Sequence, residues 1–74
     1  MHKRRFLSKM ALAGDSQKSL AEHLGMSEHT MSDKVNGKSH WRCDEIQKIA
    51  RRWELSLREV HDIFFVEEDE DNET

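Results

Sequence analysis

The sequence predicts an all-α protein that folds as a compact five-helix bundle, and three features of the chain support this prediction. The 74 residues include no proline and only three glycines, and residues that favour helices are abundant. Apolar residues recur at spacings of three and four, which is typical of helices that bury one face. Residues suited to helix caps separate these stretches. We therefore expect one folded domain over residues 1–66 and no sheet.

The first helix is expected between residues 4 and 13. Its predicted apolar stripe consists of Phe6, Leu7, Met10 and Ala13. Gly14 stands where this helix ends, because glycine accepts the backbone turn that follows a helix. Asp15 and Ser16 then offer side-chain oxygens to the free backbone amides of a second helix, which begins at Gln17.

The second and third helices are short and are joined by a three-residue turn that begins at Gly25. Glycine fits this position because the backbone adopts a left-handed conformation at the end of a helix. Ser27 is a suitable N-cap for the third helix, which is expected over residues 28–36. The inward positions of the two helices are Leu20, Ala21, Leu24, Met31 and Val35.

The fourth and fifth helices carry apolar residues at the spacing of an amphipathic helix. The fourth has acidic residues near its start and arginines near its end, as the helix dipole prefers, and Ser56 caps the fifth. The predicted buried positions are Trp41, Ile46, Ile49, Ala50, Trp53, Leu57, Val60, Ile63 and Phe64. Phe64 and Phe65 point about 100° apart on a helix, so we expect one of them to face a partner in a homodimer.

Residues 17–37 have the features of a helix-turn-helix. Ala21 is small where the two helices cross, and Gly25 turns the backbone between them. The polar face of the second motif helix is then held outward, where it fits the major groove of DNA. That face carries Ser27, Glu28, His29, Ser32 and Asp33, and Thr30 is placed to touch a thymine methyl group or a phosphate.

The stretch LAEHLGMSEHTMSDKVNGK resembles the helix-turn-helix of the Cro and phage-repressor family, also called the xenobiotic-response-element family. The later stretch DEIQKIARRWELSLREVHDIFF resembles the two closing helices of short repressors from phages and prophages of Gram-positive bacteria. The resemblance covers about residues 6–65. It implies a lambda-repressor-like fold and a sequence-specific regulator of transcription that binds double-stranded operator DNA without a cofactor.

The resemblance also implies roles for single residues. Gln17 matches the position that bonds phosphate and braces a base-reading side chain, and Asn36 and Lys38 match positions that contact the DNA backbone. Lys34 departs from the family, which often has an aliphatic or aromatic residue there; we expect its stem to pack and its ammonium to reach solvent or phosphate. The candidate DNA-binding residues are Gln17, Lys18, Ser27, Glu28, His29, Thr30, Ser32, Asp33, Lys34, Asn36, Lys38 and Arg42. Lys3, Arg4 and Arg5 are further candidates for phosphate contacts.

The charge is unevenly distributed along the chain. The formal net charge is −3, yet residues 67–74 carry six of the fifteen acidic residues and no basic one. We predict a disordered acidic tail that aids solubility, or alternatively one that folds back on the basic surface and competes with DNA.

Other classes of function receive little support from the sequence. The five histidines and Cys43 lack the spacing of zinc ligands, and no nucleotide-binding loop or catalytic group is evident, so we expect no enzyme, metal or small-molecule ligand. One cysteine cannot form an intramolecular disulfide, and no apolar run approaches the roughly 20 residues that cross a bilayer, so a cytoplasmic location is expected. The alternative function is a protein-interaction module of the antitoxin or antirepressor type.

Overall fold

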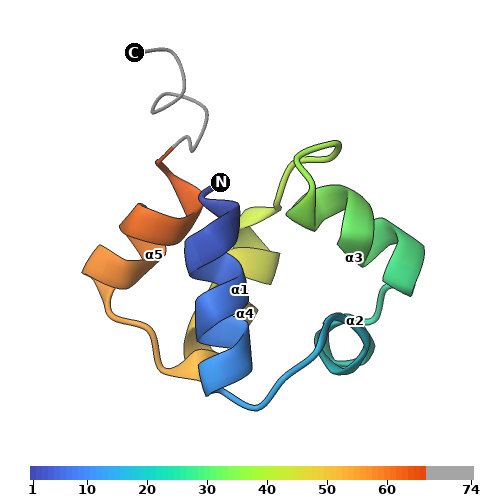
Figure 1. Ribbon diagram of the computed structural model, residues 1–74, viewed down its shortest axis with the longest axis horizontal. Helices are drawn as coiled ribbons and strands as arrows, with labels where there is room; N and C mark the ends of the chain where they lie inside the picture. Colours follow the sequence, from blue (N-terminus) through green and yellow to red (C-terminus); the bar gives the residue numbers. More distant parts are fainter. Residues whose placement is uncertain (67–74) are drawn as a thin grey trace.

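A computed structural model describes residues 1–66, which form five helices and no strand (Figure 1). The helices are α1 (Lys3–Leu12), α2 (Gln17–Leu24), α3 (Glu28–Val35), α4 (Cys43–Trp53) and α5 (Leu57–Phe64). The predicted all-α class and the five predicted helices are therefore confirmed over these residues. The tail predicted for residues 67–74 lies outside the described residues.

Serine side chains define the starts of three helices, as the sequence indicates. The Oγ atoms of Ser16, Ser27 and Ser56 each accept a hydrogen bond from the backbone amide three residues further on, at 3.1 Å in all three cases. Gly25 ends α2 in the left-handed conformation, with φ of +73°. These local signals fix the lengths of α2 and α3, and hence the geometry of the turn between them.

The core is centred on an aromatic cluster around Phe6 of α1. Its ring lies 5.2 Å from the ring of Trp53 and 6.0 Å from that of Phe64, in tilted and edge-to-face arrangements that aromatic pairs prefer. The buried apolar residues are Phe6, Leu20, Ala21, Met31, Val35, Ile49, Trp53, Ile63 and Phe64. Trp41 is half-buried at the edge of this core and donates through Nε1 to the sulfur of Met1 at 3.0 Å.

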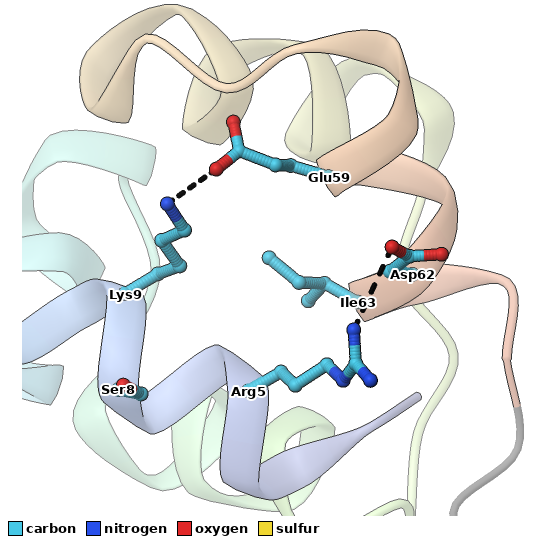
Figure 2. A pocket seen from close by; sticks show the side chains of 6 residues that line it. All are labelled: Arg5, Ser8, Lys9, Glu59, Asp62 and Ile63. Carbon is cyan, nitrogen blue, oxygen red and sulfur yellow. Dashed lines mark ion pairs between the residues drawn. The ribbon is translucent and has the colours of Figure 1, made fainter.

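Helices α1 and α5 pack antiparallel. The amide of His2 donates to the carbonyl of Ile63 at 2.6 Å, which joins the start of α1 to the end of α5. Figure 2 shows the two ion pairs that connect the helices, Lys9 with Glu59 and Arg5 with Asp62, the latter at 3.5 Å. The shallow pocket between these pairs has a volume of about 250 Å³. Its charged groups face one another across the helix interface.

Two apolar residues that the helical periodicity predicts to be buried are exposed. Ala13 is the exposed C-cap of α1, because the helix ends one residue earlier than expected, at Leu12. Leu57 is 90% exposed. It shares a stripe with Phe64 but lies seven residues away, about 10 Å along α5, at a helix end that the core does not reach. Both predictions of burial are wrong because periodicity predicts which face of a helix is apolar and not how far along the helix the core extends.

None of the helices over residues 1–66 has both the length and the apolar character required to cross a membrane.

Candidate nucleic-acid interface

Helices α2 and α3 pack against each other across the turn formed by residues 25–27. The small side chain of Ala21 is buried at this contact, and the amide of Met26 donates to the carbonyl of Ala21 at 3.0 Å. A Cβ atom placed at Gly25 would meet no neighbouring atom within 4 Å, so glycine is required here by the backbone conformation alone. The predicted burial of Ala21 and the predicted backbone turn at Gly25 are thereby confirmed.

The outer face of α3 is exposed, whereas its inner face joins the core through Met31 and Val35. His29 has an 87% exposed side chain, and its Nε2 atom lies 3.5 Å from a carboxylate oxygen of Asp33 one turn later. Glu28 is exposed at the start of the helix, and Ser32 and Asp33 are partly exposed. The structure therefore brings the predicted base-reading residues together on one accessible surface.

Ser27 and Thr30 are already engaged with each other at the start of α3. The Ser27 hydroxyl accepts from the amide of Thr30 and donates to the Thr30 hydroxyl at 3.0 Å. Their hydroxyl groups therefore hold the first turn of the helix. Both residues still lie at the rim of the exposed face.

Lys34 corrects the sequence prediction. The residue is only 8% exposed, and its ammonium donates to the carbonyl of His40 at 2.7 Å and lies 3.1 Å from a carboxylate oxygen of Glu45. The Nζ atom also lies 5.8 Å from the centre of the Trp41 ring. The expectation that this ammonium reaches solvent or phosphate is wrong, because Lys34 follows Met31 by one turn and shares its inward face. It instead joins α3 to the first turn of α4.

The end of α3 meets the start of α1. Asn36 accepts a hydrogen bond from the Lys3 ammonium at 2.7 Å and donates one to the Ser32 hydroxyl at 3.2 Å. Lys38 is exposed two residues further on. The sequence suggested Lys3 as a phosphate contact but gave no sign that it meets Asn36, because 33 residues separate them along the chain.

The remaining candidates lie at the starts of two helices. Gln17 and Lys18 form the first turn of α2, with Gln17 half-buried and Lys18 exposed. Arg42 is the residue before α4, and its guanidinium lies 3.3 Å from a carboxylate oxygen of Asp44.

Asp15 has a larger role than sequence reasoning gave it. Its side chain is 6% exposed and accepts two hydrogen bonds from Arg52, at 2.7 and 2.9 Å, one from the indole of Trp53 at 2.7 Å and one from the hydroxyl of Ser19 at 2.7 Å. The Arg52 guanidinium foremost, with help from Ser19 and Trp53, holds the pKa of Asp15 well below its usual range. Asp15 thus fastens the start of α2 to the end of α4. No local pattern predicts this, because both α4 partners lie far away in the sequence.

Comparison with known proteins adds a family and no assigned function. A sequence model described as "Protein of unknown function (DUF739)" matches residues 4–67, which is nearly all of the described fold. No curated protein and no solved structure matches the chain.

Proposed function

Because this chain belongs to the DUF739 family of unknown function, we propose its function from its own geometry: it is a transcriptional regulator of the Cro and phage-repressor type that binds double-stranded DNA sequence-specifically. The observation that carries the proposal is the accessible outer face of α3, held by α2 across a tight turn while its inner face is anchored in the core. A helix presented in this way fits the major groove, and a cytoplasmic location follows from such a role.

Base recognition falls to Glu28, His29 and Asp33. The imidazole of His29 can bond the N7 or O6 edge of a purine, and its pairing with Asp33 restrains the ring on the surface of the helix. The carboxylates of Glu28 and Asp33 can accept from the amino group of cytosine. Two acidic side chains on this face disfavour non-specific binding and favour sites that offer such donors.

Phosphate contacts supply most of the affinity. Gln17 and Lys18 lie at the start of α2, where backbone amides and the helix dipole favour an anion, and Asn36 and Lys38 lie just beyond α3. With about four to six such contacts in a pair of protomers, the logarithm of the affinity falls with the logarithm of salt concentration with a slope of roughly four to five.

The test begins with selection of bound sequences from a random pool of duplexes, followed by fluorescence anisotropy on the selected site and on random duplex. We expect His29→Ala to weaken binding to the selected site by about 1–3 kcal/mol, with little effect on random duplex. His23→Ala is the matched control, because His23 is an exposed histidine of the same motif that lies beside Arg51 and Arg52 instead. Equal losses for the two variants would contradict the assignment of α3.

A second pair of variants tests the phosphate contacts. Lys38→Gln is expected to weaken binding to every duplex and to reduce the salt slope by about one, whereas Lys48→Gln, an exposed lysine of α4, leaves both unchanged. If the wild-type chain binds no duplex at about 50 mM salt, the proposal fails, and the face of α3 serves a protein partner instead.

The proposed regulator acts as a homodimer through the end of α5. Phe64 is buried, but Phe65 is 61% exposed and borders a hollow of about 240 Å³ that Trp41 and Ile46 also line. An exposed ring beside a hollow that is partly lined by apolar side chains suits a two-fold contact, in which each copy offers the other the same surface. Sedimentation at high micromolar concentration should reveal a dimer that Phe65→Ala removes. A wild-type monomer, with operator affinity unaffected by Phe65→Ala, would exclude this contact.

A further inference from the structure

A chain of hydrogen bonds runs from the start of α1 to the outer face of α3. The Lys3 ammonium donates to the Oδ1 atom of Asn36 at 2.7 Å, and the Nδ2 atom of Asn36 donates to the hydroxyl oxygen of Ser32 at 3.2 Å. Ser32 lies partly exposed on α3, on the face proposed to meet the bases of DNA. We call Lys3, Asn36 and Ser32 the α3 relay.

The ammonium fixes the direction of these hydrogen bonds. Lysine carries donors and no acceptor, so the atom of Asn36 that faces Lys3 has to be the carbonyl oxygen. The amide nitrogen of Asn36 therefore faces Ser32, whose oxygen has to accept. An ammonium has three hydrogens and this contact uses one of them, so the direction is the same whatever other groups Lys3 meets.

The hydroxyl of Ser32 is left as a hydrogen-bond donor. A hydroxyl group has one hydrogen and two lone pairs, and Asn36 occupies one of the lone pairs. Within residues 1–66 no group accepts the hydrogen of Ser32. Hydrogen bonds in a chain polarise one another, so the charge at the head of the relay makes this hydrogen a stronger donor and the oxygen a weaker acceptor.

The relay is compatible with the phosphate contact proposed for Asn36. A side-chain amide nitrogen has two hydrogens, and the bond to Ser32 uses one of them. The second hydrogen can donate to a phosphate oxygen while the carbonyl oxygen stays on Lys3. The same side chain can therefore hold the DNA backbone and orient a neighbouring contact to a base.

We propose that Ser32 determines base specificity by donating its hydroxyl hydrogen to an acceptor on a base edge, with Lys3 and Asn36 as the residues that position it. This inference rests on the proposed function and adds a base preference to it. In the major groove guanine offers N7 and O6 and thymine offers O4 as acceptors, whereas cytosine offers an amino donor. We therefore expect Ser32 to favour guanine or thymine over cytosine at the position it contacts.

The expected preference is that of a single hydrogen bond. A serine hydroxyl without the relay can bond donors and acceptors alike, so it would discriminate little between these bases. With the relay, exchanging the favoured base for cytosine should lower affinity roughly three- to ten-fold. Selection from a random pool of duplexes gives the wild-type profile, and the position that Ser32 contacts is the one whose preference disappears in Ser32→Ala. A profile that Ser32→Ala leaves unchanged would overturn the proposal.

Asn36→Asp tests the direction of the relay. Aspartate keeps an acceptor for Lys3 but has no hydrogen to donate, so Ser32 has to donate to it and turn its lone pairs toward the DNA. The preference at that position should shift toward cytosine by roughly three- to ten-fold. An unchanged preference would overturn the proposal.

The added negative charge of Asn36→Asp should also weaken binding to every duplex, so its effect needs a matched control. Ser39→Asp adds the same charge at an exposed residue three positions further on, outside the relay. It should lower affinity for all duplexes and leave the base preference as in the wild type. A shift in preference as large as that of Asn36→Asp would show that charge alone is responsible, which overturns the proposal.

Two variants of Lys3 test where the relay begins. Lys3→Arg should keep the preference, because a guanidinium is also a donor without an acceptor. Lys3→Met should broaden it, because the amide of Asn36 is then able to turn and accept from Ser32. A profile that stays the same in Lys3→Met would overturn the role of the ammonium.

The outcomes separate this inference from the proposed function. If the wild-type chain binds a selected duplex and all variants share its profile, the inference fails and DNA binding stands. If the wild-type chain binds no duplex, both fail. The relay is also measured without DNA, because the side-chain amide signals of Asn36 in heteronuclear NMR spectra should move in Lys3→Met and in Ser32→Ala. Signals that stay in place in both variants would overturn the relay, whether or not the chain binds DNA.

Discussion

Asp15→Asn should destabilise the fold more than most single-atom changes, because its carboxylate accepts four hydrogen bonds in a nearly buried position. Each oxygen accepts two of them. Asparagine keeps one acceptor oxygen and replaces the other with a donor, so two of the four donors lose their partner in either orientation of the amide. We expect a loss of about 2–4 kcal/mol, after allowing for water that reaches the partly exposed Arg52.

A loss of this size is a large share of the roughly 4–10 kcal/mol expected for a domain of this length. It corresponds to a fall in melting temperature of about 10–25 °C. Urea denaturation followed by circular dichroism at pH 7 measures the free energy of unfolding directly. Asp44→Asn is the matched control, because that carboxylate is more than half exposed and pairs with exposed Arg42; its effect should stay within about 0.5 kcal/mol.

The pH dependence gives a second test of the same reasoning. The pKa of Asp15 in the folded chain is held below its value of about 3.9 in the unfolded chain, so the unfolded chain takes up the proton first as the pH falls. The stabilisation from Asp15 is therefore complete above about pH 5 and is lost progressively at lower pH. The Lys9 ammonium also lowers the pKa of Glu59, but it does so equally in the wild-type protein and in Asp15→Asn, so it does not affect the difference between them.

The gap in stability between wild type and Asp15→Asn should consequently narrow from pH 7 to pH 3. The reasoning is refuted if the gap at pH 7 is below about 0.5 kcal/mol, or if it is the same at both pH values.

Three further substitutions test other parts of the structure by the same denaturation assay. Gly25→Ala should cost about 1 kcal/mol through the left-handed backbone, since the site has space for a methyl group; no loss would contradict the φ of +73°. Lys34→Met should cost about 3 kcal/mol, because it leaves the mostly buried carboxylate of Glu45 without its cation. Adding Glu45→Gln should recover most of that loss, and a double variant whose losses simply add would argue against the ion pair. Leu57→Gln should change stability by less than about 0.5 kcal/mol, whereas a loss above about 2 kcal/mol would mean that Leu57 is buried after all.

Local chemistry made much of this fold predictable from the sequence. Ser16, Ser27 and Ser56 mark helix starts and Gly25 marks a helix end because caps are satisfied by atoms within a few residues. The exposed face of α3 could also be predicted, because the periodicity of Met31 and Val35 places the polar residues on the opposite side.

Contacts that join distant segments could not be predicted in this way. The ammonium of Lys34 was expected to reach solvent or phosphate, since nothing near it in the sequence shows that Glu45 and the carbonyl of His40 lie within its reach. Asp15 looked like a simple cap for the same reason. Leu57 was expected to be buried because it lies on the apolar face of α5, but the periodicity does not show how far along the helix the core extends.

The two sides of α3 have separate roles, because the buried ammonium of Lys34 anchors the helix from its inner side alone. Its inner side fixes the tilt of the helix against α4, and its outer side holds Glu28, His29 and Asp33 without contributing to that anchorage. If α3 binds DNA as proposed, new sequence preferences can therefore arise by exchanging the outer residues alone, with little loss of folding stability. A change at Lys34 would do the reverse: it would alter the orientation of the whole helix and leave the side chains of the outer face chemically intact.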